Sequence, residues 1–173
     1  MWVIKEDAAN NLKANPLIKI NVRKNYGGAI VGMQLVYSQG IQSPFFTVGS
    51  GYVTQESILV DQSKIIETVS MLTSSSQNSL KSPSIHYLDE PFEPSTQECC
   101  WKHLSVPLGR QIVGLRVGSD QIELNRIDFL LTGQEINFPS IDGFVEFGKP
   151  STNWTFEWPK RTDLVRLDLQ TVQ

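Results

Sequence analysis

Cysteine is almost absent from this chain: among 173 residues only Cys99 and Cys100 occur, and they are adjacent. Neighbouring cysteines can bridge only through a strained ring, which excludes a disulfide framework. A chain of this length buries enough apolar surface to fold as one domain without disulfides or a structural metal. We therefore expect reduced thiols and a cytoplasmic protein.

Long apolar runs and an excess of positive charge are also missing. No run approaches the ~18 residues that a membrane-spanning helix needs, and residues 1–7 carry no signal-peptide pattern. The chain has 15 Lys and Arg against 18 Asp and Glu, a net charge of −3. Because no surplus of cations faces phosphate groups, we expect neither a nucleic-acid partner nor a membrane partner.

Recognisable catalytic and metal-binding motifs are scarce. The segment Cys99-Cys100-Trp101-Lys102-His103 combines two thiols and an imidazole, and the only other histidine is His86. This set lacks a fourth ligand at the spacing of a zinc site, and no glycine-rich elbow frames either thiol. The chain also has no phosphate loop and no dinucleotide fingerprint. We expect no enzyme, no bound metal and no cofactor.

Alternating apolar and polar residues are what the chain does have, and they predict strands. The first two strands are expected at 17–23 and 30–37, separated by Gly27 and Gly28. Further strands are expected in the segments 45–48, 111–117, 124–131 and 164–169. The fold expected from this pattern is all-β, with antiparallel hairpins around one core.

Two stretches of the chain are less clear. Residues 57–72 read as two short strands, with a helix as the alternative. Residues 73–98 are polar and contain three prolines, so we expect irregular structure there.

A hairpin design occurs twice along the chain. Residues 18–40 and 113–133 each give a strand, a glycine-containing loop, a second strand and a closing glycine. Residues 164–169 look like the opening strand of a third copy whose partner strand is missing. An unpaired apolar edge must be covered, so this strand pairs either with Trp2-Val3-Ile4 or with another chain.

The second copy carries a family resemblance. Gln111 to Val117 followed by Leu124 to Leu130 resembles the closing signature of jacalin-type lectin domains, and Ile30 to Gly40 is similar to another strand of that family. The resemblance extends over residues 17–135. It implies a β-prism, in which three four-stranded sheets surround a pseudo-threefold axis and sugars bind at one end.

The resemblance also implies a ligand site. Its first loop corresponds to Gly27 and Gly28, and its second loop to the segment containing Asp120 and Asn125. Asn125 stands where the family has an aspartate, and Gln121 stands where it has a glycine. An asparagine both accepts and donates hydrogen bonds, so its pairing with sugar hydroxyls differs from that of a carboxylate.

The domain plan expected from these patterns has three parts. An N-terminal strand or arm covers residues 1–15, a jacalin-like β domain covers 16–138, and an aromatic-rich C-terminal extension covers 139–173. At a spacing of two, Trp154, Phe156 and Trp158 are expected to share one face of a strand, which is typical of core cover and of partner-binding surfaces alike. The candidate partner-binding residues are Trp154, Phe156, Trp158, Leu164, Leu167 and Leu169.

Two functions are compatible with these observations. The first is a non-catalytic structural or adaptor subunit of a larger protein assembly, built on the lectin-like scaffold and bound to other protein subunits. The alternative is a carbohydrate-binding lectin module with a glycan as its ligand.

Overall fold

The architecture is all-β, as the alternation predicts. The computed structural model describes residues 2–4, 16–49, 53–73, 79–90, 101–107, 110–132, 140–148, 154–158 and 164–166. Within these ranges every element is a strand except one short 3-10 turn at Ser38–Gly40. All the strand pairings within the sheets are antiparallel.

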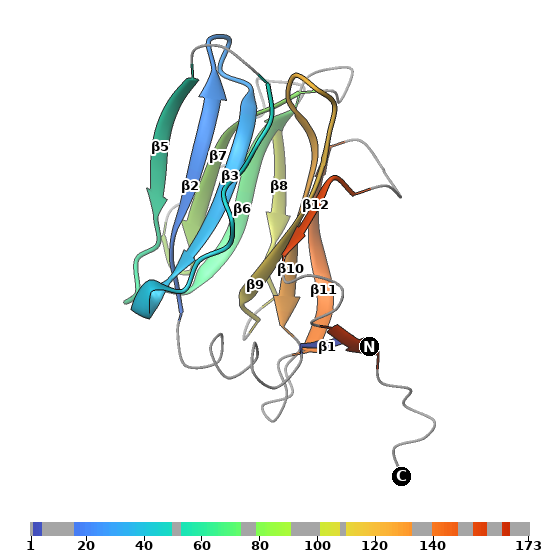
Figure 1. The fold of residues 1–173 in the computed structure, drawn as a ribbon. Coiled ribbons are helices and arrows are strands. Elements are labelled where there is room, and N and C mark those ends of the chain that lie inside the picture. The colour runs from blue at the N-terminus through green and yellow to red at the C-terminus, as the bar shows by residue number, and fades with distance from the viewer. Residues whose placement is uncertain are drawn as a thin grey trace.

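The strands form three sheets (Figure 1). The four-stranded sheet has the order β4-β3-β2-β5 and contains β2 (Leu17–Asn25), β3 (Ile30–Tyr37), β4 (Phe46–Thr47) and β5 (Val53–Leu59). The three-stranded sheet has the order β7-β6-β8 and contains β6 (Ile66–Thr73), β7 (Leu80–Tyr87) and β8 (Trp101–Ser105). The six-stranded sheet has the order β12-β9-β10-β11-β1-β13 and contains β1 (Trp2–Ile4), β9 (Ile112–Ser119), β10 (Leu124–Thr132), β11 (Ser140–Gly148), β12 (Phe156–Trp158) and β13 (Leu164–Arg166).

A single hydrophobic core joins the three sheets. Buried side chains from all three belong to one cluster, which includes Ile20, Met33, Leu35, Val69, Met71, Leu115, Phe129, Val145 and Phe147. The buried Tyr37 hydroxyl donates a hydrogen bond of 3.0 Å to the carbonyl oxygen of Ile112, which ties the four-stranded sheet to the six-stranded one. Burial raises the pKa of Tyr37 well above its ordinary value, so the phenol stays protonated. The sheets therefore fold as one body.

The structure resolves the ambiguity at residues 57–72. This segment contains the end of β5 and most of β6, so the two-strand interpretation is confirmed and the helix is excluded. Residues 68–71 are buried in succession, so this part of β6 is covered on both faces, with Val69 and Met71 in the core. Glu67 is exposed at the register shift between Ile66 and Thr68.

The expectation of irregular structure at 73–98 is wrong for residues 80–87, which form β7. Two local features hide this strand from sequence reading. Ser82 has a φ of +53°, and Pro83 follows it, so the pairing with β6 shifts register between Ser70 and Leu72. A proline lacks the N–H that a strand ladder uses, and it is tolerated here at the register shift.

The two chain ends belong to the same sheet as β9 and β10. β11 pairs with β10 and buries Val145 and Phe147, while β12 pairs with β9. In their described parts, the segments 1–15 and 139–173 are therefore not separate from the domain at 16–138. β13 pairs with β1, with Val165 opposite Val3, so the N-terminal strand is the partner of the unfinished third copy.

Candidate functional site

The two hairpin turns singled out in the sequence lie at the same end of the molecule, at the top of Figure 1. The β2–β3 turn and the β9–β10 turn both border a cavity of about 180 Å³, which we call the turn cavity. Its lining residues are Asn25, Val31, Val48, Gly49, Val53, Gln121 and Ile122. The approach is close, because a Cβ added to Gly49 would lie 3.0 Å from the carbonyl oxygen of Ile122.

Three of the four predicted ligand residues lie in these turns and Asn125 lies at the start of β10, while the cavity wall comes from their neighbours. Gly28, with a φ of +86°, closes the β2–β3 turn, and its N–H donates to the carbonyl of Asn25. Gly27 is exposed in the same turn. Asp120 Oδ1 accepts hydrogen bonds from the N–H groups of Ile122 and Glu123, at 2.7 and 2.9 Å, and so shapes its own loop.

Three amide side chains, those of Asn125, Asn25 and Gln121, also lie at the turn-cavity end of the molecule. The Asn125 side chain is half-buried, and its Oδ1 lies 3.2 Å from the position that a Cβ on Gly118 would take. Asn25 and Gln121 carry the polar side chains of the cavity wall. Sequence reasoning missed Asn25 as a site residue, although its place directly before a glycine turn was a usable signal. Burial and the neighbouring Asp120 raise the pKa of Glu123 in the same loop.

A larger cavity of about 380 Å³, the basal cavity, lies at the opposite ends of β2, β5 and β9. Segments from all three sheets reach it: the start of β2, the β5–β6 loop, the end of β8 and the start of β9. Its lining residues are Pro16, Leu17, Val60, Asp61, Gln62, Lys64, Ile65, Ile66, Val106, Arg110, Gln111 and Ile112. Sequence reasoning gave no indication of it, because its wall is assembled from four separate stretches.

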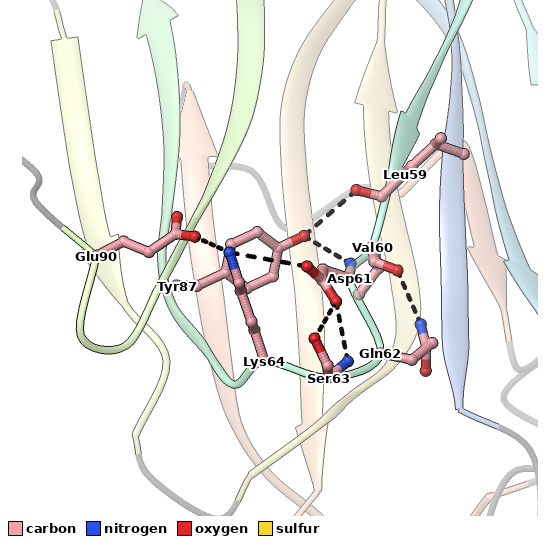
Figure 2. Close-up of polar contacts among 8 residues, drawn as sticks. All are labelled: Leu59, Val60, Asp61, Gln62, Ser63, Lys64, Tyr87 and Glu90. Carbon is pink, nitrogen blue, oxygen red and sulfur yellow. Dashed lines mark hydrogen bonds and ion pairs between the residues drawn. The ribbon is translucent and has the colours of Figure 1, made fainter.

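Hydrogen bonds hold the β5–β6 loop at the edge of the basal cavity (Figure 2). Asp61 Oδ1 accepts from the backbone N–H and the hydroxyl of Ser63, at 2.9 and 2.6 Å. Tyr87 from β7 fixes the other side of the loop, since its hydroxyl oxygen accepts from the Asp61 N–H at 2.8 Å and its proton is donated to the Leu59 carbonyl. The loop therefore has a defined shape.

The charges of this loop are paired. The Lys64 ammonium contacts the carboxylate of Glu90 and lies 3.8 Å from Asp61 Oδ2. Hydrogen bonds from Ser63, followed by the charge of Lys64, lower the pKa of Asp61. The hydrogen bond and charge of Glu90 raise the pKa of Lys64. Lys64 is thus paired with both carboxylates.

The aromatic stripe at 154–158 is split between two faces, contrary to the expectation of a shared one. Phe156 stacks on Phe46 with 5.3 Å between ring centroids, and Trp158 lies 5.7 Å from Tyr37, so both rings pack against the core. Trp154 precedes the strand, and its ring covers the Arg116 guanidinium at 4.3 Å. The three side chains diverge because the strand begins only at Phe156.

Trp154 covers a cluster of charged side chains on β9, β10 and β11. Asp128 is fully buried and binds Arg126 at 2.6 Å and Arg116 at 2.8 Å. Arg126 also reaches Glu146 at 3.2 Å. Every oxygen of the buried carboxylate thus meets a guanidinium, as a buried charge requires.

The remaining sequence-predicted residues fall as follows. The backbone of Leu164 lies in β13, whereas Leu167 and Leu169 lie outside the described residues, as do Cys99 and Cys100. His103 Nδ1 lies 2.6 Å from the Ser70 hydroxyl, and His86 lies on β7. Within the described ranges no group of three or more histidine, cysteine or acidic residues is placed to hold a metal ion.

Comparisons with known proteins identify no relative. Neither a protein-family model, nor a curated protein, nor a solved structure matches the chain. Among the described residues there is no helix that is long and apolar enough to cross a membrane.

Proposed function

We propose that this protein is a non-catalytic carbohydrate-binding module, with a scaffold of the lectin-like β-prism kind and its ligand end at the turn cavity. The observation that carries this proposal is the convergence of the β2–β3 and β9–β10 turns, far apart in sequence, on one cavity. The family resemblance implied a pair of loops of this kind as the sugar site.

The chemistry of the turn cavity supports a polyhydroxy ligand. Amide side chains both donate and accept hydrogen bonds, as sugar hydroxyls do, and Asn25 and Gln121 supply two of them. Val48 and Ile122 offer apolar surface to the C–H groups of a sugar ring.

A glycan array with the purified protein tests the proposal, followed by calorimetry with any sugar that binds. We expect Gln121→Ala to weaken binding at least about tenfold, because a hydrogen-bonding partner is lost. Gln111→Ala, the same change in the basal cavity, is the matched control and should bind as the wild type does. A blank array from folded protein, or equal binding by both variants, would contradict the proposal.

A structural subunit is the second candidate, and strand β5 favours it. β5 is an edge strand of the four-stranded sheet, and residues 53–57 are exposed in succession. Leu59, at its end, is 72% exposed. Exposed edges of this kind accept a strand from another chain. The packing of Phe156 and Trp158 on the protein's own core places this candidate second, because the expected docking arm is already occupied.

Light scattering over a range of concentrations tests the second candidate. If β5 pairs with a second copy, the mass should rise above 19.5 kDa with concentration. Leu59→Lys should keep the protein monomeric, whereas Tyr26→Lys, on the exposed β2–β3 turn, should not. A constant monomer mass for the wild type rejects pairing between copies.

A further inference from the structure

We propose that the basal cavity binds a small uncharged amphipathic molecule with an apolar body and one hydrogen-bond-donating group, such as a hydroxyl. This site lies at the opposite end of β2 from the turn cavity. The proposal does not rest on carbohydrate binding.

The apolar part of the ligand is indicated by the wall of the cavity. Leu17, Val106 and Ile112 are buried there, and Val60 and Ile66 are half-buried beside them. A dry cavity of about 150 Å³ with aliphatic walls already binds a molecule the size of benzene. At about 380 Å³, the basal cavity has room for a longer apolar body, and its volume lies within the usual range of ligand pockets.

The absence of net charge on the ligand is indicated by the polar side of the cavity. Lys64 is compensated by Glu90 and Asp61, and Arg110 is also engaged by another group of the protein. A charged ligand would lose its hydration here without gaining a counterion that is not already paired. A neutral polar group carries no such cost.

The donor character of the polar group is indicated by Gln62. Its amide nitrogen donates to two carbonyl oxygens, those of Leu17 at 2.8 Å and Val60 at 3.0 Å. Both amide protons are used, so the carbonyl oxygen is what this side chain offers to a ligand. In Figure 2 that oxygen points away from Val60. An oxygen accepts only, so the matching ligand group is a donor.

The β5–β6 loop is ordered before a ligand arrives. Asp61 binds Ser63 within the loop, and Tyr87 fastens the loop to β7. A preformed loop does not have to be ordered on binding, and this lowers the entropic cost. The side chain of Gln62 is thus held in place between two fixed residues.

Titration of the full chain with primary alcohols from 1-butanol to 1-octanol, followed by protein NMR, tests the proposal. We expect saturable shifts at the basal cavity and about a fourfold gain in affinity for each added methylene until the cavity is full. Hexanoate, which is charged, and 1-methoxypentane, which lacks a donor, should each bind at least about tenfold more weakly than 1-hexanol. Equal binding of hexanoate or of the ether overturns the proposal, as does the absence of saturation.

Two variants locate the site. Gln111 and Ile65 are exposed residues of the basal lining, and replacing either with tryptophan should block 1-hexanol without disturbing the core. Gln121→Trp fills the turn cavity instead and should leave 1-hexanol binding unchanged. If both basal variants unfold at the wild-type temperature and still bind 1-hexanol, the alcohol site is elsewhere and the proposal fails. Sugar binding is read separately, so either site can fail alone.

Discussion

At the scale of single residues, the most demanding feature is the buried carboxylate of Asp128. It lies between Arg116 and Arg126, and Trp154 covers the first guanidinium. A buried ion pair adds little stability when it replaces an apolar contact, but removing one partner leaves a buried charge uncompensated. The cluster therefore makes Asp128 hard to replace.

Asp128→Asn should reduce the free energy of unfolding by about 3 kcal/mol, because two guanidinium groups lose their counterion. Urea unfolding followed by tryptophan fluorescence measures this change. The control is Glu146→Gln, which removes an exposed carboxylate 3.2 Å from Arg126 and should cost less than about 1 kcal/mol. If both variants lose a similar free energy of unfolding, the burial of the carboxylate does not determine how much stability its removal costs.

His86 gives the molecule a dependence on pH. Burial lowers its pKa below 6.5, the nearby His103 lowers it further, and Glu90 partly opposes them. Between the lowered pKa and 6.5 the unfolded chain binds more protons than the folded one, so stability falls as the pH falls through this window.

We expect the urea midpoint to decrease as the pH falls below about 6.5, and His86→Gln to reduce that decrease. The comparison uses unfolding curves of both proteins at matched pH values. An unchanged pH profile in the variant would assign the dependence to other groups.

At the scale of elements, β12 shows how a short strand is held by side chains. It has three residues and, among the described strands, pairs with β9 alone, yet Phe156 and Trp158 both pack on aromatic rings of the four-stranded sheet. Aromatic pairs of this kind add about 0.5–1.5 kcal/mol beyond the area they bury. β12 therefore joins two sheets.

Trp158→Ala should lower the free energy of unfolding by about 2 kcal/mol, less than for a fully buried ring because Trp158 is half-buried. Thermal unfolding measures it, and Tyr26→Ala, which removes a ring that is 94% exposed, is the control. If Trp158→Ala unfolds as the wild type does, the ring is available to a partner, as the sequence-based prediction requires.

The strands also show which parts of the fold could be predicted from the sequence. Regular alternation predicted β2, β3, β9 and β10, because each has one face in the core. It failed at β7, where Ser82 and Pro83 interrupt the pattern. The turn cavity could be approached from sequence because two glycine turns mark it. The basal cavity could not, because apolar residues at strand ends look the same whether or not a cavity lies between them.

At the scale of the whole molecule, the fold is closed by its two ends. β1 lies between β11 and β13, and Val3 is opposite Ser140 on one side and Val165 on the other. A three-residue strand is too short to be stable alone, so its place in the sheet depends on both neighbours. Within the part of the chain that the structure describes, β13 in turn has β1 as its single partner strand.

This arrangement makes Val3 a test of closure. Val3→Pro removes a backbone N–H from a strand with neighbours on both sides, where proline is not tolerated, so β13 should detach. In hydrogen-exchange mass spectrometry we expect faster exchange at 164–166 and at the start of β11, with unchanged protection in β2, β3 and β6. Val3→Thr keeps the N–H and the β-branched side chain and should exchange as the wild type does. Wild-type exchange at 164–166 in Val3→Pro would mean that β13 is held by something other than β1. Faster exchange throughout would mean instead that the termini and the core unfold as one unit.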